Sequence, residues 1–383
     1  MIPYGRQNIS EADIASVVET LQSDWLTQGP AIEKFELALS NYTGASHAVA
    51  ACNATAALHL ACRALDLKHG DILWTSPNTF VASANCALYC GASVDFVDID
   101  PITYNMSPEA LEQKLKIAEK KGKLPKIIVP VHFAGLSCDM KSISALAKKY
   151  GCAVIEDASH AIGADYEGKK VGCCAYSDIA IFSFHPVKII TTGEGGVAMT
   201  NRTDLAQKMQ LLRSHGITRD QNKMQNESQG AWYYQQIDLG FNYRITDLQA
   251  ALGLSQLKRL DQFIVRRREI AATYHAKLRD LSIQLPHMDL KNQSSWHLYV
   301  IRVDNRKKIF DQLREAKIGV NVHYIPVHTQ PYYQKMGFKW GDFPNAERYY
   351  CGAISLPIFY DLKFDRQNFV IQSINSLIDV TVI

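Results

Sequence analysis

Short apolar runs alternate with longer segments of helical spacing between residues 47 and 200, and this alternation limits the possible fold more than any other feature. Strands that alternate with helices need crossover connections, so the pattern predicts an α/β fold with a mostly parallel sheet covered on both faces. In such a sheet, ligands bind at the carboxyl ends of the strands. The expected strands are 47–52, 72–75, 93–97, 126–131, 153–156, 179–184 and 196–200, and the expected helices include 56–67, 79–89, 108–121 and 140–150.

The alternation stops near residue 242. A long helical pattern follows, and a shorter mixture of helix and strand succeeds it, as a small α+β domain would require. We therefore expect a large domain over residues 1–245, including two N-terminal helices, and a small one over residues 246–383; a chain of 383 residues has room for both. The elements expected in the second part are a helix at 246–279, strands at 298–303 and 319–327, and helices at 307–317 and 366–377.

Composition and charge argue against several classes of partner. The formal net charge is +3. No run of five like charges occurs, so there is no electrostatic case for a nucleic-acid or membrane partner. The nine cysteines form no Cys-x-x-Cys pair, which favours reduced thiols over a metal site. With neither a signal peptide nor an apolar run of about 18 residues, we expect a cytoplasmic protein.

Two of the expected strands end in segments suited to an anion or to close backbone contact. The sequence Asn53-Ala-Thr55 opens directly into a helix, and free N–H groups at a helix start suit a phosphate. The same residues also suit a plain helix cap. The segment Gly193-Glu-Gly-Gly196 opens no helix, so it does not fit a dinucleotide loop; it favours a tight turn or a close approach of the backbone to a ligand.

Two further strand ends carry charged residues. Asp157 follows a buried strand, and a carboxylate there needs a cationic or hydrogen-bonded partner. Asp157 and His160 with a serine suggest a hydrolytic triad, but the Gly-x-Ser-x-Gly elbow is missing, and an acid that binds a protonated ring nitrogen fits as well. Lys188 lies among aliphatic residues, where it either extends toward solvent or, if desolvated, serves as a Schiff-base amine.

Five motifs in order along the chain resemble those of the DegT/DnrJ/EryC1/StrS sugar aminotransferases, and the likeness runs from about Tyr4 to the last helix. Such enzymes have the fold type I architecture, with a large sheet domain and a small C-terminal domain, and they use pyridoxal phosphate. The motifs are Asn53-Ala-Thr55; Asn78-Thr-Phe-Val-Ala-Ser-Ala-Asn85; Glu156-Asp-Ala-Ser-His-Ala-Ile-Gly-Ala164; Ser183-Phe-His-Pro-Val-Lys188 with Gly193-Glu-Gly-Gly196; and Gly240-Phe-Asn-Tyr-Arg-Ile-Thr-Asp247.

The resemblance implies a role for each charged or aromatic residue of these motifs. Lys188 matches the family lysine that bonds covalently to the cofactor and moves a proton between the amino carbon and the cofactor. Asp157 matches the acid that keeps the pyridine nitrogen protonated. Phe80 matches the aromatic residue that stacks on the ring, and His160 matches a neighbour of the cofactor's phenolic oxygen.

The resemblance also implies how the phosphate is held. Ala54 and Thr55, with Ser183, match the phosphate-binding residues of the family. Asn242 matches an asparagine that reaches the phosphate of the neighbouring subunit's cofactor. A homodimer with shared sites is therefore implied.

The expected reaction moves the amino group of L-glutamate to C-4 of a UDP-2-acetamido-2,6-dideoxy-4-keto-hexose, with no metal required. By the same likeness, ten residues are expected to contact the sugar nucleotide. They are Tyr4, Asp24, Trp25, Leu26, Thr27, Asn53, Asn321, Val322, His323 and Tyr324.

Four alternatives accompany this expectation. The chain is an aminotransferase for another UDP-, dTDP- or GDP-linked 4-keto-6-deoxysugar, or it is a non-catalytic, regulatory protein that binds pyridoxal phosphate. A sugar dehydratase of the same family is disfavoured, because such enzymes carry histidine at the position of Lys188. A nicotinamide-dependent sugar dehydrogenase is disfavoured because the dinucleotide fingerprint is missing.

Overall fold

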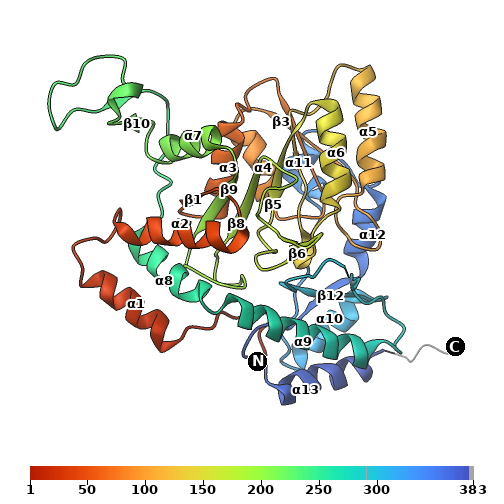
Figure 1. Ribbon diagram of the computed structural model, residues 1–383. Helices are drawn as coiled ribbons and strands as arrows, with labels where there is room; N and C mark the ends of the chain where they lie inside the picture. Colours follow the sequence, from red (N-terminus) through yellow and green to blue (C-terminus); the bar gives the residue numbers. More distant parts are fainter. Residues whose placement is uncertain (290, 379–383) are drawn as a thin grey trace.

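The computed structural model describes residues 1–289 and 291–378 and is built around a seven-stranded sheet in the order β1-β9-β8-β5-β4-β2-β3 (Figure 1). Neighbouring strands are parallel from β3 to β8, and β9 alone runs against its two neighbours. The prediction of a mostly parallel sheet is thus confirmed. The strands are β1 (His47–Ala51), β2 (Ile72–Thr75), β3 (Ser93–Phe96), β4 (Ile127–Val129), β5 (Ala153–Asp157), β8 (Ile179–Ser183) and β9 (Gly196–Thr200).

Helices cover both faces of the sheet because successive strand residues point to opposite sides. In β2, for example, Leu73 packs into the core beneath α3, α4 and α7, whereas Trp74 packs against α5 and α6. In β9, Val197 lies with α2 on the side opposite Ala198. These helices are α2 (Pro30–Thr43), α3 (Ala54–Ala64), α4 (Ala82–Tyr89), α5 (Pro108–Lys120), α6 (Met140–Tyr150) and α7 (Thr203–Arg213).

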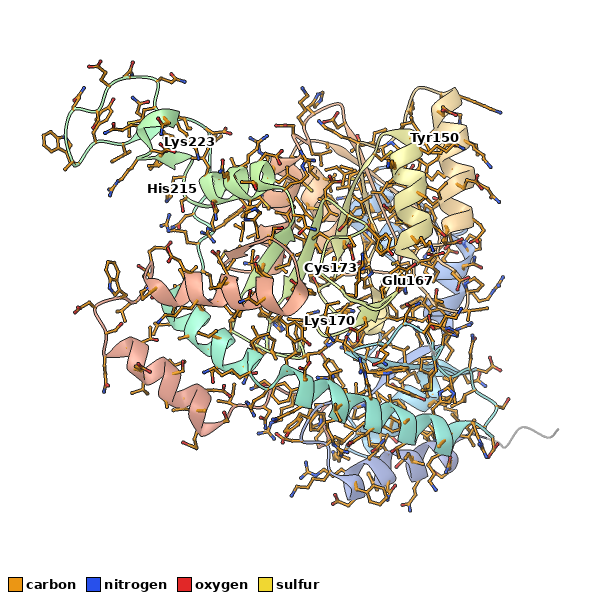
Figure 2. All side chains as sticks on the ribbon, viewed as in Figure 1. Tyr150, Glu167, Lys170, Cys173, His215 and Lys223 are labelled. Atoms are coloured by element: carbon orange, nitrogen blue, oxygen red, sulfur yellow. The ribbon has the colours of Figure 1, made fainter. Side chains whose placement is uncertain are left out.

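Residues 217–236 form an arm that extends away from the sheet, next to α7 (Figure 1). The two strands β10 and β11 pair at its base. Figure 2 shows side chains filling the space between the sheet and its helices, and it places Lys223 on this arm. The short elements of this half are β6 (Asp165–Tyr166), β7 (Lys169–Lys170), β10 (Ile217–Thr218), β11 (Gln235–Gln236) and the 3-10 turns Phe133–Gly135 and Gln221–Lys223.

The prediction of a single helix at 246–279 is wrong, because the structure has two helices there, α8 (Asp247–Leu257) and α9 (Leu260–Leu278). Neither glycine nor proline marks the break. Arg259 leaves helical geometry, with φ −108° and ψ 3°, and its guanidinium lies 2.6 Å from the buried carboxylate of Asp13. Asp13 belongs to α1 (Glu11–Leu21), which packs on α8. An ion pair between residues distant in sequence therefore accompanies the break between the two helices. The sequence around residue 259 alone does not indicate this break.

The strand predicted at 319–327 is also wrong. This segment makes a single bridge, between Asn321 and Ser355, and then turns into a 3-10 helix after Pro326. The actual partner of β12 (Tyr299–Arg302) is β13 (Ala353–Leu356), which the sequence pattern missed. The remaining elements are α10 (Arg306–Glu315), the 3-10 turn Val327–Thr329, α11 (Pro331–Gln334), α12 (Pro344–Gly352) and α13 (Phe364–Asn375).

The C-terminal elements have an apolar core of their own. It joins α9, α10 and α13 to the β12–β13 pair and includes Ile2 near the start of the chain. The division of the chain at residue 245 stays a prediction. None of the helices within residues 1–289 and 291–378 combines the length and the apolar composition that crossing a membrane demands.

Candidate active site

A cavity of about 620 Å³ opens at the carboxyl edge of the sheet. Its walls come from residues that follow β1, β2, β4, β5 and β8, and residues 321–324 of the C-terminal part close it from the other side. The parallel strands bring these residues together because their carboxyl ends meet at one edge. The cavity therefore lies where the strand pattern predicts a ligand site.

Lys188 lies in the turn that follows β8 and lines this cavity. Hydrogen bonds hold the turn: the amide of Thr192 and the hydroxyl of Thr191 both donate to the carbonyl of Phe184. Desolvation by burial lowers the pKa of Lys188 to about 8, and the nearby Asp157 carboxylate opposes that shift. About half of the Lys188 side chains are thus neutral near pH 8.

Asp157, the last residue of β5, is 5% exposed and faces the same cavity. One carboxylate oxygen accepts a hydrogen bond from the Ser83 hydroxyl at 2.6 Å, and the other accepts one from the backbone amide of Ser159 at 3.1 Å. The two donors fix the orientation of the carboxyl group. The site thus holds a buried carboxylate beside an amine of lowered pKa.

The start of α3 forms the third wall. Asn53 caps the helix by accepting from the amide of Ala56, so the plain-cap interpretation of this residue is confirmed. The preceding residues Ala54 and Thr55 line the cavity, as does Ser183 at the end of β8. The positive end of a helix with a neighbouring hydroxyl is suited to a phosphate group.

The structure shows why a glycine is needed at position 196, the first residue of β9. A Cβ atom at this position would lie 2.5 Å from the backbone nitrogen of Ala54. Gly196 pairs in the sheet with both Ala51 and Ser183, so the strand has no freedom to move aside. The absence of a Cβ at Gly196 therefore leaves room for the start of α3. This close approach is between two parts of the chain, and an approach of the segment to a ligand stays a prediction.

We expect Gly196→Ser to weaken binding of the pyridoxal phosphate that the sequence resemblance implies by about tenfold. The added side chain would push the start of α3 away from Ser183, and overpacking of this kind costs about 1–3 kcal/mol. Titration of the apoprotein with pyridoxal phosphate, followed by absorbance, gives the dissociation constant. Ala272→Ser, on the exposed side of α9 and away from the cavity, is the control for an added serine. Equal affinity in the Gly196 variant and the native protein would contradict this assignment.

Three histidines and a tyrosine lie together along one part of the cavity: His160, which follows β5, and His297, His323 and Tyr324 of the C-terminal part. The Tyr324 hydroxyl lies 3.0 Å from Nε2 of His160, and the His160 and His297 rings are 4.4 Å apart. Burial, reinforced by the charge of Lys188, lowers the pKa of His160 well below its usual range and that of His323 to about 4. Burial, with His160 next in effect, likewise lowers the pKa of His297. These rings are therefore neutral at pH 7.

Phe80 lines the cavity beside Tyr324, with ring centroids 6.2 Å apart. The Phe80 side chain is 58% exposed. An apolar ring that is open to a polar cavity suits stacking against a flat ligand.

Thirteen of the predicted site residues lie in one cavity, and nine further residues outside the predicted set line it with them. The predicted residues are Tyr4, Asn53, Ala54, Thr55, Phe80, Asp157, His160, Ser183, Lys188, Asn321, His323 and Tyr324, together with Val322. The additional ones include Thr79, Val131, Ser159, His185, Glu194 and His297. His297 gave no signal because it precedes a strand of the C-terminal part, far from the other motifs.

The structure does not bring the other predicted residues into this cavity. Asp24, Trp25, Leu26 and Thr27 lie in an exposed loop between α1 and α2. Asn242 is exposed and forms a backbone bridge with Ser214. Their roles in substrate or cofactor binding stay predictions.

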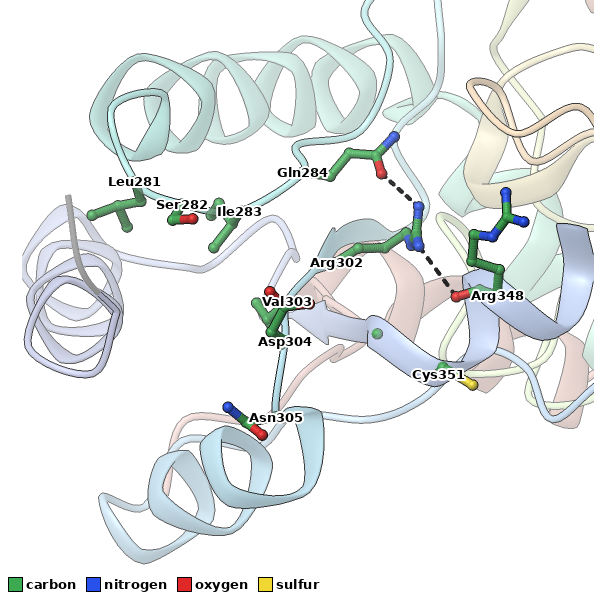
Figure 3. Close-up of a pocket in the computed structure, with 11 residues that line it drawn as sticks. Leu281, Ser282, Ile283, Gln284, Arg302, Val303, Asp304, Asn305, Arg348 and Cys351 are labelled. Carbon is green, nitrogen blue, oxygen red and sulfur yellow. Dashed lines mark hydrogen bonds between the residues drawn. The ribbon is translucent and has the colours of Figure 1, made fainter. Parts of the chain in front are cut away.

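A second hollow of about 640 Å³ lies between the loop at 281–284 and the start of α10 (Figure 3). Arg302 lines this hollow, and its guanidinium donates hydrogen bonds to the side chain of Gln284 and to the carbonyl of Arg348. Its hydrogen-bonding groups are therefore engaged within the protein. No lysine lines this hollow, and its carboxylate is that of Asp304, so it has no buried pair like Lys188 and Asp157. The first cavity is therefore the candidate active site.

Comparisons with known proteins agree with this geometry. Residues 7–375 match the model of the DegT/DnrJ/EryC1/StrS aminotransferase family. The UDP-4-amino-4,6-dideoxy-N-acetyl-beta-L-altrosamine transaminase of Campylobacter jejuni serotype O:23/36 is 39% identical over 99% of this chain and 98% of its own.

Two solved structures extend the comparison. The putative sugar aminotransferase Spr1654 of Streptococcus pneumoniae, solved in its PMP-form, superposes with a TM-score of 0.91 at 32% identity, covering 98% of this chain and 99% of that one; a PLP-form is also known. Helicobacter pylori PseC, an aminotransferase involved in the biosynthesis of pseudoaminic acid, superposes with a TM-score of 0.90 at 33% identity over 98% of both chains. The chain therefore belongs to the DegT/DnrJ/EryC1/StrS family of pyridoxal-phosphate-dependent sugar aminotransferases.

Proposed function

We propose that this enzyme moves the amino group of L-glutamate to C-4 of UDP-2-acetamido-2,6-dideoxy-4-keto-hexose and forms UDP-4-amino-4,6-dideoxy-N-acetyl-β-L-altrosamine. The observation that carries the proposal is the pairing of Lys188, with its pKa lowered to about 8, and the buried carboxylate of Asp157 in one cavity. The names of the Campylobacter transaminase and of PseC support the choice of sugar and a place in pseudaminic acid biosynthesis.

The residues of the cavity fit pyridoxal phosphate. The start of α3 and Ser183 would hold the phosphate, Phe80 would cover one face of the ring, and Asp157 would pair with the ring nitrogen. A buried ring nitrogen of His160, Nδ1, has no hydrogen-bond partner among the described residues, as expected where a polar ligand group is to be bound. Bound there, the cofactor supplies an electron sink for the carbon that loses a proton.

Lys188 carries the proton transfers. As a neutral amine, Nζ would accept the proton that leaves the amino carbon of glutamate, and the resulting ammonium would release it again within the same half-reaction. The second half-reaction would use the same two steps in reverse and deliver a proton to C-4 of the sugar. Ser83 and Ser159 donate to the two oxygens of Asp157 and so orient its carboxyl group. The neutral rings of His160 and His323 add no positive charge that would compete with protonation of Lys188.

The pH dependence of cofactor capture by the apoprotein follows from Lys188. The groups that face this amine are Asp157, His160, His297 and His323. Because the lysine pKa is lowered to about 8, the neutral, nucleophilic fraction rises as the pH rises through that value. We expect the capture rate to increase about tenfold per unit below pH 7 and to level off above pH 9. Stopped-flow absorbance measures the rate, and a profile still rising at pH 10 would contradict the lowered pKa.

A homodimer completes the site in this proposal. Lys188 is the one lysine and there is no arginine among the residues that line the cavity, whereas the diphosphate of a UDP-sugar requires cationic donors. The arm exposes Trp232, which is 73% accessible, and Leu239 is exposed close by. These residues and the exposed Trp25 and Asn242 support contact with a second copy. Light scattering at micromolar concentration should give twice the mass of the chain.

The substrate is tested with a panel of acceptors. The enzyme is incubated with L-glutamate and UDP-, dTDP- and GDP-linked 4-keto-6-deoxysugars, and NMR identifies each product and its configuration at C-4. We expect the highest kcat/KM for the UDP-linked 2-acetamido sugar. Preference for another nucleotide or sugar would contradict the substrate, and failure of glutamate to bleach the visible band of the cofactor would indicate a non-catalytic binder.

A further inference from the structure

We propose that the hydroxyl pair Thr79 and Ser83 is a positioning relay that fixes the charge and orientation of Asp157. This inference rests on the proposed role of Asp157 as the partner of the cofactor's ring nitrogen. Neither hydroxyl is needed by the chemistry at Lys188. Both belong to the segment that leaves β2 and begins α4.

The geometry forms an unbroken chain of hydrogen bonds. The Thr79 and Ser83 hydroxyl oxygens are 2.7 Å apart, and the Ser83 hydroxyl lies 2.6 Å from Oδ2 of Asp157. All three side chains are buried, with Ser83 0% exposed. No cation forms an ion pair with Asp157 among the described residues, so hydrogen bonds supply its direct stabilisation.

The direction of the chain is set by the carboxylate. An ionised carboxylate only accepts, so Ser83 must donate its single proton to Asp157. The other acceptor near the Ser83 hydroxyl, the carbonyl of Phe80, is farther away at 3.4 Å. The Ser83 oxygen then accepts from Thr79, whose hydroxyl contacts no other acceptor among the described residues. Hydrogen bonds to a charged group are shorter and stronger than neutral ones, and each bond in such a chain polarises the next.

The relay also connects the position of Phe80, proposed to cover the cofactor ring, with the position of the Asp157 carboxylate. Thr79 contacts Ser83 and Ser83 contacts Asp157, whereas Phe80, which lies between the two hydroxyl residues in sequence, opens into the cavity. Movement of residues 79–83 would therefore displace the aromatic face and the carboxylate together. Thr79 lines the cavity, but Ser83 lies behind it and acts only through Asp157.

The test compares Ser83→Ala with Ser83→Thr, Thr79→Val and a matched control, Ser255→Ala. Ser255 is likewise a buried serine near a buried carboxylate, that of Asp13, but it lies away from the cavity. The readouts are the dissociation constant of pyridoxal phosphate and the pH titration of its visible band in the holoenzyme. The kcat and KM of amino transfer are measured as well.

We expect Ser83→Ala to weaken cofactor affinity and lower kcat, each about tenfold, to shift the titration of the visible band, and to leave KM for the sugar unchanged. Thr79→Val should show about a threefold loss of affinity, Ser83→Thr should restore native values, and Ser255→Ala should keep native affinity and spectrum. If Ser83→Ala does not fold, the cofactor affinity and the pH titration of Thr79→Val decide the test.

Two results overturn the relay. One is native affinity and titration in both Ser83→Ala and Thr79→Val. The other is the same loss in Ser255→Ala, which indicates a general effect on stability. Asp157→Asn is measured in parallel. If this variant keeps native cofactor affinity, the proposed role of Asp157 is wrong. If Asp157→Asn loses cofactor affinity but the Ser83 and Thr79 variants behave as the native protein does, only the relay is wrong.

Discussion

Replacing Lys188 with alanine is expected to lower the rate of amino transfer by at least about 10³-fold. The substitution removes both the amine that holds the cofactor and the group that moves the proton, and general acid–base catalysis alone contributes about 10²–10⁴-fold. The cavity should otherwise persist, because Thr191 and Thr192 hold the turn through bonds that do not involve the lysine side chain. Single-turnover conversion of glutamate, followed at the visible band of the cofactor, measures the effect.

Lys208→Ala is the control for loss of a lysine. Lys208 forms an ion pair with Asp66 on the surface, away from the cavity. This variant should keep the native rate. Amino transfer by the Lys188 variant within tenfold of the native rate would contradict the assignment of this residue.

Asp157→Asn is expected to lower kcat by about 10²–10³-fold, the range seen when a preorganised electrostatic partner is removed. The asparagine is of nearly the same size but carries no charge, so the ring nitrogen of the bound cofactor loses its anionic partner. The Ser83 hydroxyl and the Ser159 amide would also face an amide in place of a carboxylate. Circular dichroism should show the native fold, and kinetics with saturating cofactor separates lost chemistry from lost binding.

Asp178→Asn provides the comparison. Asp178 is an acid close to the same sheet that pairs with Arg202 outside the cavity. We expect near-native kcat for it. Equal losses in the two variants would indicate that the Asp157 effect is structural.

The central sheet was predictable from the sequence because each buried parallel strand is a short apolar run between helical segments. The errors arose where long-range contacts decide the structure. The interruption between α8 and α9 accompanies the pairing of Arg259 with Asp13, which is distant in sequence. Residues 319–327 have the composition of a strand, but β13 takes the place beside β12.

The site was predictable to the extent that its residues follow strands. Lys188, Asp157 and the start of α3 each stand at a strand end, and the resemblance assigned their roles. Ser83 and His297 were missed, because a serine in a helix and a histidine before a strand carry no chemical pattern of their own. Their importance appears only when the hydrogen bond to Asp157 and the contact with His160 are seen.

The most direct test of the account is to reduce the purified holoenzyme with borohydride and to map the modified peptide by mass spectrometry. Reduction fixes the cofactor on the amine to which it is bonded. Lys188 is the one lysine that lines the cavity, so the account predicts a single pyridoxyl adduct on that residue and none after prior incubation with L-glutamate. An adduct on another lysine, or an unmodified Lys188 in the glutamate-free sample, would contradict it.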